Sequence, residues 1–498
     1  MQPSIRAEFE GIQLGDHRLN QRVLRMVEKM AARPTALFPE LFDPAEVQAS
    51  YRLLDHDEWT PEQLLGPHYA ATVQRASVYS EARMLHDGSY MTHGRGGKGR
   101  DFYKLGNNLY GYISHVSLAA TTDGVPLGIG NLMHVKRDTD APSEQAPACE
   151  GSSDHDNATD APPAQAPSEQ TPLGEGSSKE AKEEKESQRW LTAVQQTAQR
   201  FAGLSLIHVM DSEANSYTLL AALLSQGHRF VIRGDARNVE VHPKTRWEKQ
   251  NILKLLRQRP VLGERQVELS ERTASDPRSK RNPDRKARIA RLQMRSAKVF
   301  LPRPDHLRGT GPNAQPRRIQ LNVVLVEELQ APEGEVPVQW ILLTSEPIET
   351  LAEVEAVVDH YCARWLIEEL FKAVKTGCAF EKRQFEYQHT SQNALALILP
   401  IAWQMLLLRA VERRHSNAPA KELLGEALPV LRAIAKRRLP SRPTVAHVMA
   451  AIAELGGHKK SNGPVGWLVL ARGMNRLRDA VMLAHRLRAA PQARRHDL

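Results

Sequence analysis

The sequence predicts an α/β fold in which a mixed sheet is covered by helices and flanked by two helical regions. Three patterns support this prediction. Strand and helix patterns alternate from residue 78 to residue 234. Helical periodicity dominates residues 1–72 and the chain after residue 378. Between the alternating region and the last helices, residues 244–345 carry strand-like runs and form a predicted β-rich insertion.

Residues 1–72 are predicted to form a small helical bundle with one basic side. Apolar residues from Leu14 to Met30 recur at helical spacing, and Pro34 ends this helix. Asp43 and Thr60 are expected to cap the next two helices, since each precedes a proline at a first helical position. The other side of the first helix is basic, with Arg18, Arg22, Arg25 and Lys29. A solvated face and a DNA contact both explain that side.

The central region alternates between strands and helices. SVYSEARMLHDGSYMTH is predicted to be a strand that ends near Asp87, and two further strands meet at the Asp123-Gly124 turn. A helix over SQRWLTAVQQTAQRFAG then leads to the buried strand LSLIHVMD, which ends at Asp211. Such sheets usually build their sites at the carboxyl ends of strands. An aspartate in that position is also a common turn or helix cap, so each one alone is a weak indication.

Residues 138–187 are predicted to be a disordered, dispensable insert of Pro, Ser, Ala, Glu and Asp. APSEQ at 141–145 returns at 166–170, which suggests a short tandem duplication. The segment has 13 acidic and 3 basic side chains, so the net charge of the chain is +9 with it and +19 without it. This excess, with the basic region 244–318, favours a polyanionic partner, and nucleic acid before a membrane.

The N-terminus, the apolar runs and the cysteines of the sequence bear on its localisation and its redox chemistry. MQPSIRAEFEG lacks the apolar stretch of a secretory signal, and no run of eighteen apolar residues occurs, so we expect a cytoplasmic protein. Three cysteines, Cys149, Cys362 and Cys378, have neither CxxC nor zinc-site spacing. They are expected to be ordinary reduced thiols.

The helix YCARWLIEELFKAVKTG at 361–377 places four polar side chains on one stripe. At 100° per residue, Tyr361, Arg364, Glu368 and Lys375 fall within about 60° of the helical wheel. Ion pairs four residues apart, Arg364 with Glu368 and Glu368 with Lys372, would explain part of this stripe. An anion or metal site would explain all of it, and the stretch alone leaves both interpretations open.

Three carboxylates complete the candidate site: Asp87, Asp211 and Glu368. Mg²⁺ prefers oxygen ligands from a few carboxylates and retains waters. Two such ions activate a nucleophile and stabilise the leaving oxygen in phosphodiester chemistry. Arg364 and Lys375 on the same stripe would hold phosphates, and Tyr361 would donate a hydroxyl.

With these residues the sequence resembles bacterial insertion-sequence transposases of the DDE type that carry a Y-(2)-R-(3)-E-(6)-K signature. It is similar among them to the cut-and-paste transposase of the kanamycin-resistance composite transposon. The likeness rests on HDGS around Asp87, LIHVMDSEA around Asp211, HRFVIR, WILLTSEP and the helix at 361–377. It departs in Gly88, where a threonine is common, and in the insert at 138–187, where the relative has a shorter linker.

The resemblance implies three domains: 1–72 binding DNA ends, 73–377 as an RNase H-like (retroviral-integrase-like) core with the β insertion, and 378–498 for dimerisation. It implies that Asp87, Asp211 and Glu368 bind two Mg²⁺ ions, with Mn²⁺ able to substitute. Tyr361, Arg364 and Lys375 would contact phosphates, and Trp340 would stack on a flipped base, although a buried strand aromatic is an equal interpretation of that residue.

The implied activity is nicking at terminal inverted repeats, hairpin formation and strand transfer into target DNA. Its partners would be double-stranded DNA and a second copy in a homodimer, in a nucleoid-associated protein with no membrane partner. Two alternatives stay open. One is a DNA-binding repressor derived from a transposase, and the other is an RNase H-like nuclease that cuts without joining.

Overall fold

The computed structural model describes eleven stretches of the chain: 4–56, 58–95, 101–106, 109–135, 179–241, 248–269, 286–307, 315–459, 461, 463 and 465–489. Most of the predicted insert at 138–187 therefore lies outside the described residues, as does Cys149. The end of the insert does not match the prediction, because helix α5 (Lys179–Arg200) begins eight residues before the expected start at Ser187. KEAKEEKE consists almost wholly of strong helix formers, with opposite charges three and four residues apart.

The N-terminal helices form as predicted. In α1 (His17–Ala32) the Asp16 side chain accepts from the Arg18 N–H, and the apolar side is buried. Asp43 and Thr60 are confirmed as caps, each with a capping box and a proline in the first turn. The helices of this region are α1, α2 (Phe38–Leu41), α3 (Pro44–Leu54) and α4 (Pro61–Ala76).

Twelve strands of the described residues form one sheet at the centre of the molecule, in the order β2-β3-β1-β5-β6-β12-β11-β10-β7-β8, with β4 on β3 and β9 on β10. The β1–β5 and β5–β6 pairs are parallel and the others are antiparallel, which confirms a mixed sheet. The first six strands are β1 (Glu81–Arg95), β2 (Tyr103–Gly106), β3 (Leu109–Ala120), β4 (Pro126–Val135), β5 (Ser205–Met210) and β6 (Arg229–Gly234).

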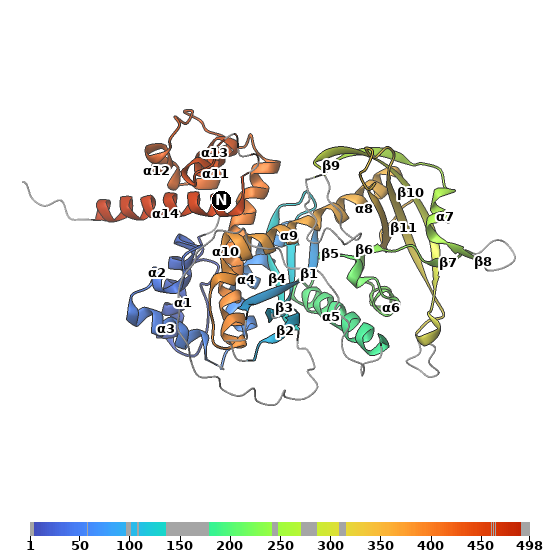
Figure 1. The fold of residues 1–498 in the computed structure, drawn as a ribbon, viewed down its shortest axis with the longest axis horizontal. Coiled ribbons are helices and arrows are strands. Elements are labelled where there is room, and N and C mark those ends of the chain that lie inside the picture. The colour runs from blue at the N-terminus through green and yellow to red at the C-terminus, as the bar shows by residue number, and fades with distance from the viewer. Residues whose placement is uncertain are drawn as a thin grey trace, which may run out of the picture.

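The remaining strands are β7 (Asn238–Val241), β8 (Glu248–Asn251), β9 (Gly263–Leu269), β10 (Arg288–Pro302), β11 (Arg318–Glu328) and β12 (Gln339–Thr344). All but β7, which precedes it, lie in the region 244–345 that was predicted to be β-rich, together with the short helix α7 (Ile252–Arg257). β12 pairs with β6 on one side and with β11 on the other, so these strands continue the central sheet. In Figure 1 this part of the sheet lies at the opposite end of the molecule from the terminal helices.

Strand β1 does not end near Asp87 as predicted. It continues to Arg95, because its pairing with β3 runs on past Asp87, which lies opposite Val116. The parallel pairing with β5 does stop earlier, at Leu85 opposite Val209. Asp87 therefore lies in mid-strand, two residues beyond the point where β1 and β5 separate.

Helices cover both faces of the sheet (Figure 1). Helix α5 and α6 (Tyr217–Ser225) lie on one face, where Trp190 packs edge-on against His115 of β3. Helices α8 (Leu351–Ala363) and α9 (Trp365–Lys372) lie on the other face, where α8 packs against β5, β6 and β12, and α9 against β1. Residues alternate between faces along a strand, so Asp87 faces α9 and its neighbour His86 faces α5.

The C-terminal helices share the core of the sheet. They are α10 (Gln388–Arg414), α11 (Ala420–Leu424), α12 (Ala427–Ile434), α13 (Val445–Leu455) and α14 (Trp467–Ala489). One cluster of buried apolar side chains runs from Ile5 to Leu477. Among the described residues α10 alone is long and apolar enough to cross a membrane, but 83% of its apolar window is buried in the protein, which is usual for a core helix.

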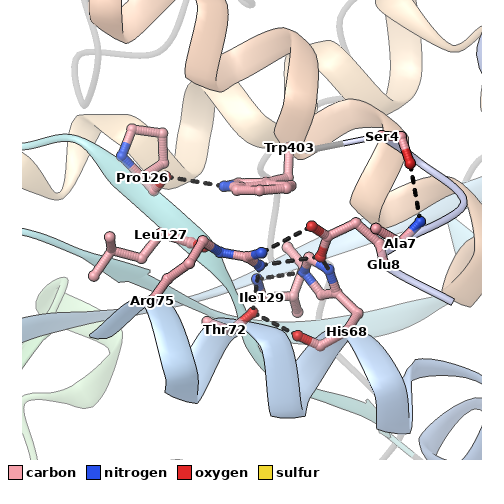
Figure 2. Close-up of polar contacts among 10 residues, drawn as sticks. All are labelled: Ser4, Ala7, Glu8, His68, Thr72, Arg75, Pro126, Leu127, Ile129 and Trp403. Atoms are coloured by element: carbon pink, nitrogen blue, oxygen red, sulfur yellow. Dashed lines mark hydrogen bonds and ion pairs between the residues drawn. The ribbon is translucent and has the colours of Figure 1, made fainter. Parts of the chain in front are cut away.

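A buried polar cluster joins the N-terminal segment to α4, β4 and α10 (Figure 2). Both Glu8 carboxylate oxygens accept from Arg75, and one is 2.5 Å from Nδ1 of His68. Nε2 of His68 accepts from the Ile129 N–H at 3.0 Å, so the neutral ring must carry its proton on Nδ1. The Arg75 guanidinium lies 4.4 Å from the ring centre of Trp403 on α10. Through these contacts Glu8 fixes the start of the chain to the core.

Candidate active site

The site lies where β1 meets α9. Arg364, between α8 and α9, lies beside two of the predicted carboxylates. Its Nη1 donates to Oδ2 of Asp87 at 3.3 Å, and its Nη2 donates to Oε1 of Glu368. The Asp87 side chain is 15% exposed and that of Glu368 28% exposed, so both carboxylates are partly shielded from water. One guanidinium thus bridges acids from two elements that are 281 residues apart in sequence.

The charge of Asp87 is poorly compensated despite this guanidinium. Burial and the carboxylates of Asp211 and Glu368 raise the pKa of Asp87 to about 8, against the opposing charge of Arg364 and a bond from the Gly88 N–H. Burial acts to lower the pKa of Arg364, but the surrounding acidic groups, Glu368 first, outweigh it and raise that pKa. The site therefore holds more negative charge than one arginine balances.

Asp211 lies directly after β5, as predicted. Its Oδ1 accepts from the Glu213 N–H at 2.9 Å and caps the 3₁₀ turn Ser212–Ala214, so the capping interpretation of this residue is also correct. Asp211 nevertheless acts electrostatically on Asp87 and on Arg364. The structure thus brings all three predicted carboxylates into one electrostatic neighbourhood, built from β1, the end of β5 and α9.

The donor set suits a hard divalent cation. Three carboxylates from separate elements supply the oxygen ligands that Mg²⁺ and Mn²⁺ prefer, and the raised pKa of Asp87 marks negative charge that such an ion would balance. Within the described stretches of the chain, no three His, Cys, Asp or Glu side chains are grouped closely enough to hold an ion. The Arg364 guanidinium bridges two of the three acids instead.

The helix at 361–377 is not continuous, contrary to the prediction. Helix α8 ends at Ala363, α9 begins at Trp365, and residues Ala373–Gly377 form a π-helical turn. The Cys378 N–H donates to the Ala373 carbonyl at 2.7 Å, a bond five residues back. The predicted stripe requires a uniform 100° per residue, and both the break at Arg364 and the π-helical turn change that angle. The four polar side chains therefore do not follow one straight stripe along a regular helix.

The predicted ion pairs along this helix are half correct. Arg364 does pair with Glu368, but Lys372 pairs with Glu369 at 3.1 Å rather than with Glu368. Buried Glu369 also lies near Arg409 of α10, with 3.7 Å between Nη1 of Arg409 and Oε2 of Glu369. Glu368 is therefore left with Arg364 and the site acids.

Tyr361 and Trp340 pack against each other. Tyr361 is 7% exposed, and its ring centre lies 5.4 Å from that of half-buried Trp340 in an edge-on arrangement. The Arg364 guanidinium lies 6.0 Å from the Tyr361 ring centre. Trp340 thus belongs in part to the core, as one of its two interpretations expected.

Lys375 lies in the π-helical turn, apart from the three carboxylates. Its Nζ is 3.5 Å from Oε1 of Glu381, in the 3₁₀ turn Phe380–Lys382. The same oxygen accepts from the backbone N–H of Thr92 at 3.2 Å and from its hydroxyl at 2.7 Å. Sequence analysis did not single out Glu381, and neither its position nor its neighbours suggested a partner on β1.

A pair of neutral histidines lies behind the site, on the α5 face of the sheet. Nε2 of His86 is 2.9 Å from Nδ1 of His208, and Nδ1 of His86 is 2.9 Å from the Ser117 hydroxyl. Complete burial holds the pKa of both rings well below the ordinary value. The histidine contact ties β1 to β5, and the serine contact ties β1 to β3, next to Asp87. Sequence analysis missed them, although each histidine stands one to three residues before a predicted acid.

The two cysteines within the described residues, Cys362 and Cys378, are free thiols as predicted. Burial raises the pKa of Cys362 to about 11 and that of Cys378 to about 12. Neither thiol is poised to act as a nucleophile or a metal ligand at neutral pH.

Two family models match parts of this chain. The Transposase DNA-binding family matches residues 1–59. The Transposase DDE domain family matches residues 179–403, a range that contains Asp211 and Glu368 and begins after Asp87. One solved structure, of the piggyBac transposase synaptic complex with hairpin DNA, is similar at a TM-score of 0.35 and 12% identity, over 96% of this chain and 74% of that chain. A likeness at that TM-score adds no argument. A DNA-binding domain followed by a DDE domain supports the assignment of this chain as a DDE transposase.

Proposed function

We propose that this protein moves an insertion sequence by cut-and-paste transposition. It would hydrolyse phosphodiesters at terminal inverted repeats, form hairpin ends and join the freed ends to target DNA. The observation that supports this most is geometric: Arg364 donates to Asp87 of β1 and to Glu368 of α9. Asp211, directly after β5, acts with Glu368 to raise the pKa of Asp87 beyond the effect of burial.

Asp87, Asp211 and Glu368 would hold the divalent ions, Mg²⁺ or Mn²⁺, two in each site. Bound there, the ions would activate the attacking water or 3′-hydroxyl and stabilise the leaving oxygen. Arg364 would first have to leave its place between Asp87 and Glu368. A DNA phosphate would then replace the lost carboxylate partners.

The other predicted side chains would hold the DNA. Arg364 and Lys375 would contact phosphates beside the cut, with the Tyr361 hydroxyl as a further donor. Trp340 would stack on a base turned out of the duplex, which requires its half-exposed edge to be reached by DNA. In the N-terminal domain, the exposed Arg18 and Arg25 of α1 would contribute phosphate contacts.

We further propose a homodimer that brings two DNA ends together, in a cytoplasmic, nucleoid-associated protein. The recognised sequence would be read by the domain matched at residues 1–59. The two domain matches describe a single chain, so the dimer and the pairing of DNA ends are proposals that go beyond them.

The products formed from DNA test the proposal. Purified protein would be incubated with Mg²⁺ or Mn²⁺ and DNA that carries the terminal inverted repeats of its own element. Hairpins and joined products support transposition. Bare nicks would indicate an RNase H-like nuclease, and shifted but uncut DNA would indicate a repressor derived from a transposase.

The role of Asp211 is tested by Asp211→Asn. We expect loss of cutting with nearly unchanged end binding in a gel-shift assay, because the change removes a metal ligand and adds no repulsion toward DNA. Asp305→Asn, at an exposed position between β10 and β11, is the matched control and should cut normally. Cutting by Asp211→Asn at the wild-type rate would remove Asp211 from the site.

A further inference from the structure

Glu381 is an acidic residue with no role in the proposed chemistry, yet it connects two parts of the site. Its Oε1 takes three contacts: the backbone N–H of Thr92 at 3.2 Å, the hydroxyl of Thr92 at 2.7 Å and Nζ of Lys375 at 3.5 Å. Thr92 lies on β1, the strand that carries Asp87. Lys375 follows Glu368 by two helical turns. Glu381 therefore ties the lysine of one element to the strand of the first aspartate.

Two irregular backbone segments put Glu381 in that place. The π-helical turn Ala373–Gly377 ends the helix of Glu368, and Ala379 then adopts a left-handed conformation with φ of 48° and ψ of 39°. A left-handed conformation is uncommon for a residue with a side chain. It reverses the chain so that Glu381 lies back beside Lys375, six residues earlier.

The surrounding packing holds these irregular segments firmly. Cys378 and Phe380 are buried, and a Cβ on Gly377 would come within 2.9 Å of Met405 of α10. Irregular backbone that is fixed by the core is found most often where a side chain must be aimed. The side chain aimed here is Lys375, whose exposed fraction of 23% is small for a lysine.

The contact leaves Lys375 able to bind a further anion. An ammonium group has three N–H donors, and Glu381 engages one side of it. Thr92 fixes the carboxylate by two bonds, so the carboxylate, rather than the flexible lysine, sets the geometry of the pair. A lysine without this partner would spread over many rotamers and would meet a phosphate less often in the productive position.

We propose that Glu381 is a positioning residue that holds Lys375 in place for its phosphate contact during DNA cutting. This inference rests on the proposed function, in which Lys375 contacts a phosphate beside the cut. Glu381 touches neither DNA nor metal in this role, and it acts through Lys375 alone.

A double-mutant cycle tests the inference. Glu381→Gln keeps an acceptor for Thr92 and removes the charge that holds Lys375, while Lys375→Ala removes the held side chain. The rate of first-strand cutting would be measured in single turnover, with saturating end DNA and Mg²⁺. We expect Glu381→Gln to cut about tenfold more slowly, since small misplacements of a positioning group have effects of about this size or larger. Glu381→Gln in the Lys375→Ala background should cause no further loss.

Two more variants keep the result interpretable. Thr92→Val retains the β-branched shape and the backbone N–H but removes the hydroxyl, so it should slow cutting in the same direction by a smaller factor. Its result decides the matter if Glu381→Gln fails to fold. Glu349→Gln breaks a matched ion pair, with Lys298 at 2.6 Å, and should cut at the wild-type rate.

The possible outcomes separate the inference from the proposed function. Wild-type cutting by Lys375→Ala would overturn the phosphate role of Lys375 itself. Slow cutting by Lys375→Ala with wild-type or faster cutting by Glu381→Gln would overturn only the role of Glu381, and faster cutting would make it a competitor for the lysine. An equal loss from Glu381→Gln with and without Lys375 would show that Glu381 acts independently of the lysine, which also contradicts the inference.

Discussion

Two buried carboxylate clusters of this protein differ in how their charge is balanced. The first is the polar cluster of Figure 2, called the joint below, which attaches the N-terminal segment to the core. Burial acts to raise the pKa of its one carboxylate, Glu8, but the contacts with His68 and Arg75 outweigh burial and lower that pKa. At the candidate active site, three carboxylates face one guanidinium, and the pKa of Asp87 is raised to about 8. In the first cluster, hydrogen-bond donors on Arg75 and His68 balance the one carboxylate. In the second cluster, one guanidinium is too little positive charge for three carboxylates.

This difference separates a structural cluster from a functional one. The Glu8 cluster is complete within the chain, so its purpose is met by folding alone: it attaches the N-terminal segment to α4, β4 and α10. The Asp87 cluster has more acidic groups than its one guanidinium balances, so we expect added cations to stabilise it. Removing a carboxylate should therefore lower the free energy of unfolding at the first cluster. At the second cluster it should leave that free energy unchanged or raise it.

The largest effect is expected at the joint. Glu8→Ala leaves Arg75 and His68 without their partner in a buried setting and should lower the free energy of unfolding by about 3 kcal/mol. Urea denaturation would measure the loss. Glu10→Ala, which removes a partner of Arg6 on the surface, is the control and should change stability by less than about 0.5 kcal/mol. A similar small change for Glu8→Ala would mean that the joint contributes little.

Metal binding should stabilise the active site but not the joint. An ion that binds the folded state at a hundred times its Kd adds about 2.7 kcal/mol to the free energy of unfolding. Mg²⁺ or Mn²⁺ should therefore raise the melting temperature of the wild type and of Glu10→Ala, compared with the same proteins in EDTA. Asp87→Asn should lose this rise. A rise of equal size in Asp87→Asn would place the ion elsewhere.

Without metal, Asp87→Asn should not destabilise the protein. Asparagine keeps the side-chain volume and removes a carboxyl group that two neighbouring acids disfavour as an anion, so we expect equal stability or a gain of up to about 1 kcal/mol. The measurement is denaturation in EDTA at pH 8. A loss as large as that of Glu8→Ala would show that the two clusters are alike, which contradicts the comparison.

The joint should also give a pH dependence with a defined sign. The pKa of Glu8 is lowered in the folded state from an ordinary value of 4.5, so its stabilisation is present above pH 4.5 and is lost as pH falls through the lowered value. Glu8→Gln cannot ionise, and the stability difference between wild type and variant should therefore shrink below pH 4.5. Denaturation curves between pH 3 and pH 7 would show this, and a difference that is constant with pH would refute the assignment.

The smallest effect on stability is expected from a deletion within the insert at 138–187. Removing residues 141–165, one copy of the 25-residue duplication, should leave the melting temperature unchanged, because the segment has few apolar side chains to bury. A fall of more than about 5 °C, equivalent to roughly 1 to 2 kcal/mol, would show that it packs on the protein.

Sequence patterns predicted the helices and strands better than the points where they end or break. The caps at Asp43 and Thr60 and the turn at Gly124 follow from local rules, and the structure has them. The end of β1 was wrong because pairing with β3 extends a strand past the point where its other neighbour leaves, and pairing is not a local property. The break at Arg364 and the π-helical turn were missed because helical periodicity assumes regular geometry.

The sequence indicated the residues of the candidate site but not the contacts among them. Asp87, Asp211, Arg364 and Glu368 were all singled out, but the bond from Arg364 to Asp87 spans 277 residues and leaves no pattern in the sequence. Glu381 and the His86–His208 pair escaped for the same reason: each depends on which strand passes beside it. A histidine shortly before each aspartate was the one visible sign, and it acquires meaning only once β1 and β5 are known to be neighbours.

The central claim is that Asp87, Asp211 and Glu368 form one site for divalent cations. Its most direct test is calorimetric titration of Mn²⁺ into protein assembled with terminal-repeat DNA, for the wild type and for Asp87→Asn, Asp211→Asn and Glu368→Gln. We expect Mn²⁺ to bind the wild type, and each single variant to lose at least tenfold in Mn²⁺ affinity. Wild-type Mn²⁺ affinity in any one of the three would contradict a shared site.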